Sequence, residues 1–199
     1  MNVFQKIDEN LFLLLNGNHK SVLDFLMLFA SNLASFVIVF LVCIYVSIKY
    51  SKGRYEHYYT FLNTFLIIFL IVFQFFLSYY LLDGLIKDLF YRDRPCMNPN
   101  ISSFVRLLDD TCNPNNRSPF AVRVFLMVSL SSFFLFIIKS GFKGFKFVLI
   151  LWSLLVAYSR IYLGDHYPLN VLISAAIGVA LGFLISKLYS YLKNDLLVI

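Results

Sequence analysis

Five long apolar runs decide what this chain of 199 residues can fold into. A helix that crosses a bilayer needs about 20 predominantly apolar residues. The runs of that length are Val22–Ile48, Phe61–Ile86, Phe120–Ile138, Phe145–Leu163 and Leu169–Leu192. Asp24, Asn32 and Ser35 interrupt the first run, so we expect its first part to be kinked or to lie at the membrane interface. The pattern predicts an all-α fold, a polytopic membrane helix bundle of five to six helices in a single domain covering residues 1–199.

The composition excludes an ordinary soluble globule. Charged residues make up 14% of the chain and hydrophobic residues 60%, whereas soluble domains carry about 25% charged residues. The net charge of +6 would suggest nucleic acid as the partner of a soluble domain. Here most basic residues stand at the ends of apolar runs, where membrane orientation and anionic lipid groups explain them better. We therefore expect membrane lipids, and no nucleic acid, as partners.

The first fifteen residues have a different pattern from the spans. Phe4, Ile7, Leu11 and Leu14 recur at helical spacing, with charged and polar residues between them. This pattern predicts a short N-terminal amphipathic helix at the membrane interface. It does not resemble a secretory signal, because no short apolar stretch with a small-residue cleavage site follows it.

Basic links predict the orientation of the bundle. The short links at 49–57 and 139–146 carry lysines and an arginine, and two further lysines lie near the C-terminus. The positive-inside rule places these regions in the cytoplasm, so the 87–117 loop and the 159–168 turn face the other side. That long loop is also basic, and we interpret its basic residues as functional: Lys87, Arg92, Arg94, Arg106 and Arg117.

The two cysteines in the long loop could form a disulfide or be two free thiols. Cys96 and Cys112 are 16 residues apart, whereas Cys43 lies inside the first span. A disulfide between the loop cysteines would contribute about 3 kcal/mol by the chain-entropy model, and disulfides persist on the extracytoplasmic side. The alternative is two unpaired thiols.

Ionisable groups gather at the ends of three different spans on one predicted face. They are Lys87, Arg94, Arg117, Ser118, Arg123, Ser159, Arg160 and His166. Arginine offers a planar fork of donors to phosphate oxygens and lysine a point charge. Ser118 and Pro119 would begin the third span as helix N-cap and first residue, which adds backbone N–H groups for an anion. Each cation alone could merely snorkel to the interface, but their spacing together favours a phosphate site with His166 as nucleophile or base.

The spacing of these residues resembles a known family. The segments KDLFYRDRP at 87–95 and SRIYLGDHYPLN at 159–170 resemble two motifs of the type-2 phosphatidic acid phosphatase superfamily of membrane lipid phosphatases, which shares its core with vanadium haloperoxidases. The resemblance extends from about residue 4 to 190. The family's second motif is degenerate, because Phe120 stands where the family has a catalytic histidine. The third motif departs at its last position, where Asn170 replaces an aspartate.

The resemblance implies roles for the matching residues. Lys87, Arg94 and Arg160 would bind the phosphate together with Ser118, and His166 would form a phosphohistidine. The missing histidine at Phe120 would have protonated the leaving oxygen. The missing aspartate at Asn170 would have oriented His166, and the Asn170 carbonyl can still accept a hydrogen bond from its ring. The resemblance also implies a bacterial inner membrane, with the site on the periplasmic or extracytoplasmic face.

The two departures predict a preference among substrates. A general acid contributes about 10²–10⁴ in rate, but it matters little when the leaving group is already stable as an anion. A phosphate monoester, with a second pKa of about 6, leaves from a diphosphate without a donated proton. We therefore expect diphosphates of the polyprenyl or lipid A type to be favoured over phosphatidate. Arg117 or Arg123 would neutralise the developing charge.

Three functions stay open from the sequence. The first is a membrane phosphohydrolase or phosphotransferase that acts on a lipid phosphate or diphosphate. The second is a catalytically inactive relative that binds or presents a phosphorylated lipid. The third is an unrelated transporter or assembly factor, supported only by Asn63 and Gln74 inside the second span, since such residues more often hydrogen-bond between helices. Asp109, Asp110 and Asp165 form no metal-ligand set, and we expect no metal or other cofactor.

Overall fold

The computed structural model describes residues 3–17, 20–52, 57–80, 92–108, 120–138 and 141–196, and in these ranges it contains helices and no strands. The α-helices are α1 Val3–Asn16, α2 Ser21–Ser31, α3 Leu33–Lys52, α4 His57–Tyr79, α5 Val122–Ile137, α6 Lys143–Tyr162 and α7 Pro168–Leu196. Two short 3-10 helices, η2 Pro95–Met97 and η3 Ser102–Phe104, lie between α4 and α5. The predicted all-α membrane bundle is confirmed.

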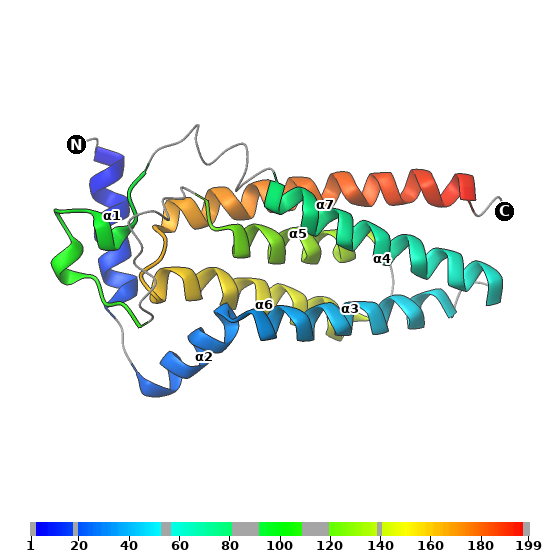
Figure 1. The fold of residues 1–199 in the computed structure, drawn as a ribbon, viewed down its shortest axis with the longest axis horizontal. Coiled ribbons are helices and arrows are strands. Elements are labelled where there is room, and N and C mark those ends of the chain that lie inside the picture. Colours follow the sequence, from blue (N-terminus) through cyan, green and yellow to red (C-terminus); the bar gives the residue numbers. More distant parts are fainter. Residues whose placement is uncertain are drawn as a thin grey trace.

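Four of the helices are long and apolar enough to cross a membrane, namely α3, α4, α6 and α7. Figure 1 shows them running lengthwise beside the shorter α5. Helix α5 packs mainly against α7, and also against α6 and α4. Its 16 residues are enclosed by the longer helices, which explains why so much of it is buried.

Small residues allow α5 and α7 to approach closely. A Cβ atom on Gly182 would overlap the Ser132 hydroxyl and the Ser129 carbonyl oxygen, and one on Gly178 would lie 2.8 Å from the Phe125 carbonyl oxygen. Two glycines four residues apart on one helix face are typical of close packing between membrane helices. This close contact holds α5 and α7 together, and the first turns of both helices carry part of the site.

The polar residues inside α4 join helices together. The Asn63 amide donates to the Ser51 hydroxyl on α3 at 2.8 Å and accepts from the Tyr189 hydroxyl on α7 at 2.8 Å. Gln74 donates to Ser129 on α5. These contacts are the interhelical hydrogen bonds expected of polar groups in a membrane bundle, and they remove the sequence support for a transporter.

The first apolar run is two helices rather than one. It divides at Asn32, whose backbone N–H closes α2 on the Phe29 carbonyl and whose side chain accepts from Ala34 N at 2.9 Å at the start of α3. Asp24 lies in α2, where it forms a paired contact with both terminal nitrogens of Arg106 at 2.9 and 2.8 Å. The predicted kink therefore coincides with a change of helix.

Helix α1 lies crosswise at one end of the bundle (Figure 1), where it contacts α6 and α7. Its apolar stripe faces outward, because Phe4 is 81% and Leu14 68% exposed, whereas Asp8 and Glu9 are buried. A helix with apolar residues outside and carboxylates inside suits an interface between lipid and a polar site.

Candidate functional site

The turn of residues 163–167 between α6 and α7 forms the centre of the site. Gly164 has a φ of +86°, and a Cβ there would lie 2.9 Å from the Arg106 carbonyl oxygen, so this position needs glycine. The backbone N–H groups of Asp165 and His166 both donate to the Arg160 carbonyl oxygen, each at 3.1 Å. The turn therefore folds back onto the end of α6, which brings Arg160, Asp165 and His166 together.

Asp165 links two arginines that are far apart in the sequence. One carboxylate oxygen lies 3.2 Å from Arg94 Nη1, and the other lies 2.5 Å from Arg160 Nη2. All three side chains are more than 90% buried. Among the described residues, two guanidinium groups here face one carboxylate, and positive charge in a dehydrated place attracts an anion strongly.

A third arginine joins this group through the end of α2. Arg123 Nη1, at the start of α5, donates to the Ser31 carbonyl oxygen at 2.6 Å and to its hydroxyl at 2.8 Å. Arg160 Nη1 donates to the same Ser31 hydroxyl. Arg123 is exposed whereas Arg160 is buried, so the cationic group extends from the interior to the surface.

His166 lies within the field of these arginines. Burial lowers the pKa of its imidazole well below the usual 6.5, and Arg160, Arg94 and Arg123 lower it further. The ring is therefore neutral near pH 7 and keeps a lone pair for attack. Its Nδ1 atom is buried and has no hydrogen-bond partner among the described residues.

Asn170 bonds elsewhere. Its carbonyl oxygen accepts from Arg92 Nη1 at 3.1 Å, whereas the sequence had left it able to accept a hydrogen bond from the His166 ring. Arg92 also pairs with Asp8 of α1 at 2.7 Å and stacks on the Tyr167 ring, 3.8 Å from its centroid. Arg92 thus contacts Asn170 in the first turn of α7, Asp8 on α1 and the ring of Tyr167.

Helix α1 contributes to the same region through its buried carboxylates. Asp8 Oδ1 accepts from the backbone N–H of Leu169, the second residue of α7, at 2.9 Å. Glu9 accepts from Asn98 at 2.8 Å, and Asn98 donates to the Tyr167 hydroxyl at 3.0 Å. The amphipathic helix therefore caps α7 and holds the segment that follows His166.

Several predicted positions fall outside the described residues. They are Lys87, Arg117, Ser118 and Cys112. Cys96 is disulfide-bonded and Cys43 is free, but because Cys112 is not described, its pairing stays a prediction. Arg94, Arg123, Arg160 and His166 lie in one connected group, and Asn170 lies beside it on α7.

The predicted start of α5 is wrong. We expected Ser118 as N-cap and Pro119 as first residue, but α5 begins at Val122 after Ala121, with no side-chain cap. Ala121 N instead donates to Ser174 Oγ on α7 at 2.8 Å, so α7 satisfies the backbone here. Phe120, where the resemblance led us to expect a histidine in the family, is 7% exposed and belongs to the main hydrophobic core.

Sequence reasoning missed Asp165, Ser31 and Asp8 as parts of this region. Asp165 stands next to His166 in the motif, and that adjacency was an available signal. Ser31 and Asp8 lie far away in the sequence and carry no pattern that points to the site. Within the described part of the chain, no three His, Cys, Asp or Glu side chains lie close enough to hold a metal ion.

Comparisons with known proteins show the fold and the family of the chain. A crystal structure of LpxE from Aquifex aeolicus matches with a TM-score of 0.57 and 24% sequence identity, covering 89% of this chain and 93% of that one, so the two share a fold. A search of curated proteins finds no match. The family model for the PAP2 superfamily matches residues 68–194, well over half of the chain. The chain therefore belongs to the PAP2 superfamily.

Proposed function

We propose that this protein is a membrane phosphohydrolase that removes phosphate from a lipid phosphate or diphosphate through a phosphohistidine. Membership of the PAP2 superfamily and the shared fold support a lipid phosphatase. The observation that carries the proposal is a buried, neutral imidazole at His166 beside the guanidinium groups of Arg94, Arg160 and Arg123. A site of this kind binds a phosphate and presents a nucleophile to it.

The chemical step follows from these groups. The arginines hold the phosphate oxygens while a nitrogen of His166 attacks phosphorus and the bond from phosphorus to the leaving oxygen breaks. Because Nδ1 is sealed from solvent, we assign the attack to Nε2. Water then breaks the phosphorus–nitrogen bond, which releases inorganic phosphate and restores the imidazole. Phe120 supplies no proton to the leaving oxygen, so a diphosphate, whose leaving group is a stable anion, is the preferred substrate.

We place the site on the extracytoplasmic face of a bacterial inner membrane. The ends of the helices opposite the site carry Lys49, Lys52, Lys143 and Lys146, and basic ends of spans face the cytoplasm. The site then lies at the outer surface, with α1 at the lipid interface.

Phosphate release from two substrate types tests the proposal. The purified chain in phosphatidylcholine vesicles is given phosphatidic acid or a polyprenyl diphosphate. We expect faster release from the diphosphate and no release by His166→Ala. His57→Ala is the matched control, because His57 is exposed at the far end of the bundle. A preference for phosphatidic acid would reject the diphosphate assignment, and unchanged turnover by His166→Ala would reject the phosphohistidine.

A second function is favoured by a specific observation. The Asn170 carbonyl accepts from Arg92, and the His166 Nδ1 atom has no partner among the described residues. The group formed by Arg94, Arg123 and Arg160 is therefore present, while no described side chain supports the nucleophile. A protein that binds or presents a phosphorylated lipid without hydrolysing it would show this combination. Absent turnover together with lipid binding that needs Arg94 and Arg160 would support this function instead.

A further inference from the structure

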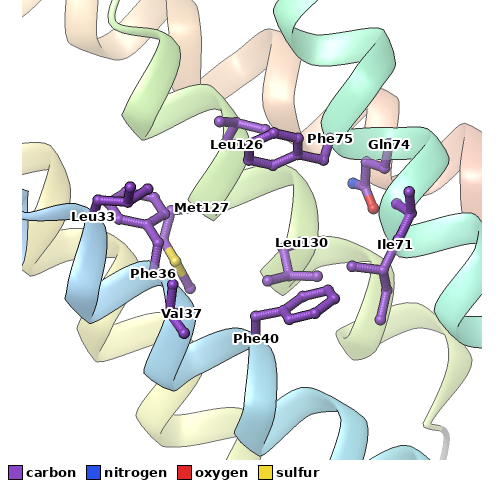
Figure 2. A pocket seen from close by; sticks show the side chains of 11 residues that line it. Leu33, Phe36, Val37, Phe40, Ile71, Gln74, Phe75, Leu126, Met127 and Leu130 are labelled. Atoms are coloured by element: carbon purple, nitrogen blue, oxygen red, sulfur yellow. The ribbon is translucent and has the colours of Figure 1, made fainter.

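An apolar groove opens on the membrane-facing side between α3, α4 and α5. It encloses about 280 Å³. Figure 2 shows Leu33 and Val37 from α3, Ile71 and Phe75 from α4, and Leu130 from α5 around this space. With the exception of Gln74, its lining is apolar.

The groove has a buried floor and exposed edges. Ile71 is 4% and Met127 1% exposed, whereas Leu33 is 70%, Val37 49% and Phe75 55% exposed. A hydrocarbon chain can therefore enter from the side, out of the bilayer, without any part of the bundle opening. Lipid tails are as apolar as leucine, so selective occupancy would require a good fit or a tether.

The cationic group of the site supplies such a tether at one end of the groove. On α5, Arg123 precedes Met127 by four residues and Leu130 by seven, so the three share one helix face. On α3, Leu33 stands two residues after Ser31, whose carbonyl and hydroxyl accept from Arg123. The walls formed by α3 and α5 thus begin close to the contact between Arg123 and Ser31. Seven residues of helix extend about 10 Å from there into the membrane.

One polar atom interrupts the apolar wall. Gln74 is 2% exposed and lines the groove, its amide nitrogen donates to Ser129, and its amide oxygen has no partner among the described residues. A buried acceptor without a donor costs free energy, and a hydroxyl or amide N–H on a bound chain would satisfy it.

We propose that this groove binds a hydrocarbon tail of the lipid whose phosphate groups are held by Arg123, Arg160 and Arg94. The proposal rests on the phosphate binding in the proposed function but not on turnover. The groove then selects lipids by their tails, and the arginines hold the head group at the membrane surface. Ordinary lipids of the bilayer compete for the groove without this tether.

Photo-crosslinking tests the proposal. The probe is a diacylglycerol diphosphate with a diazirine in one acyl chain, added to the His166→Ala chain in phosphatidylcholine vesicles so that it is not consumed. The matched probe is phosphatidylcholine with the same diazirine chain. We expect the diphosphate probe to label groove residues of α3 and α5 preferentially, and excess unlabelled diacylglycerol diphosphate to suppress this labelling. Arg123→Gln should reduce it as well.

A groove-filling variant and its control sharpen the test. Leu130→Trp should reduce groove labelling by the diphosphate probe by at least about fourfold, because the indole displaces one or more methylene groups of the tail and each contributes about 0.8 kcal/mol. Leu151→Trp on α6, where Leu151 is 55% exposed and outside the groove, should leave it unchanged. Competition by unlabelled diacylglycerol diphosphate is measured on a chain with the original groove residues. The test therefore remains decisive even if Leu130→Trp misfolds.

Two outcomes separate this proposal from the proposed function. Identical labelling by the two probes, or labelling that ignores the unlabelled competitor, would overturn the tail site even if phosphate release is rapid. Tethered groove labelling, combined with no phosphate release from any lipid by the parent chain, would support the tail site and reject the phosphohydrolase.

Discussion

Replacing Asp165 by asparagine should destabilise the chain through the two arginines that it bridges. The carboxylate is 3% exposed and lies 3.2 Å from Arg94 and 2.5 Å from Arg160. Removing one partner of a buried ion pair costs about 3–5 kcal/mol, because the remaining charge stays buried without compensation. The amide of Asp165→Asn keeps one acceptor oxygen, so we expect the lower value, about 3 kcal/mol.

Thermal unfolding followed by circular dichroism in detergent measures this loss. One kcal/mol corresponds to about 2–4 °C in Tm for a chain of this size, so Asp165→Asn should lower Tm by about 6–12 °C. Asp195→Asn is the matched control, because Asp195 is exposed near the C-terminus, and a surface change of this kind stays within about 0.5 kcal/mol. A shift for Asp165→Asn no larger than that of the control would refute the argument that the carboxylate holds the arginines.

Inorganic phosphate should recover part of the stability lost by Asp165→Asn. A dianion can face both guanidinium groups once the carboxylate is gone, and a ligand that binds only the folded state stabilises it by mass action. The rise in Tm with added phosphate should be larger for Asp165→Asn than for the parent chain. An equal rise in both would show that phosphate does not reach Arg94 and Arg160.

Three further predictions follow from the same region. The pKa of His166 in the folded chain lies below 6.5, so its contribution to the free energy of unfolding should be complete above pH 6.5. Below pH 6.5 this free energy should fall by up to about 1.4 kcal/mol per pH unit. Tm measured from pH 7.5 to 5 should show this decrease in the parent chain and lose it in His166→Gln. Arg123→Gln should raise the His166 pKa, which would move the acidic limb of the kcat/KM profile upward in pH. Asp8→Ala should lower stability by about 0.5–2 kcal/mol, seen as a lower Tm, because Leu169 loses its cap and Arg92 its carboxylate.

The sequence predicts the bundle well because the bilayer imposes a strict condition. Long apolar runs match α3, α4, α6 and α7, and the helical spacing of Phe4 and Leu14 matches the exposed face of α1. The division of the first run at Asn32 was predicted only as a kink, since its exact form depends on backbone closure at Phe29 and Ala34. Boundaries of this kind depend on local hydrogen bonds that composition does not show.

The site was less predictable because its contacts cross long stretches of chain. Arg94, Arg160 and His166 could be named from motif spacing, and the structure places them together. Ser31 is 129 residues from Arg160, to which it is hydrogen-bonded, and no local pattern signals that contact. The start of α5 was predicted wrongly for the same reason. The backbone N–H of Ala121 donates to Ser174, which lies on another helix, α7.

The asparagine at position 170, where the resemblance led us to expect an aspartate, makes physical sense together with Arg92. Arg92 already pairs with Asp8 at 2.7 Å, and its guanidinium also donates to Asn170. A neutral amide accepts from Arg92 without adding a second negative charge, and it leaves His166 without an anionic neighbour on α7. Burial, and after it the nearby arginines, therefore keep the imidazole neutral and give no support to a cationic form. A site built this way suits substrates that carry much negative charge, because among the described residues the single carboxylate of Asp165 pairs with Arg94 and Arg160, and bound phosphate adds further counter-charge.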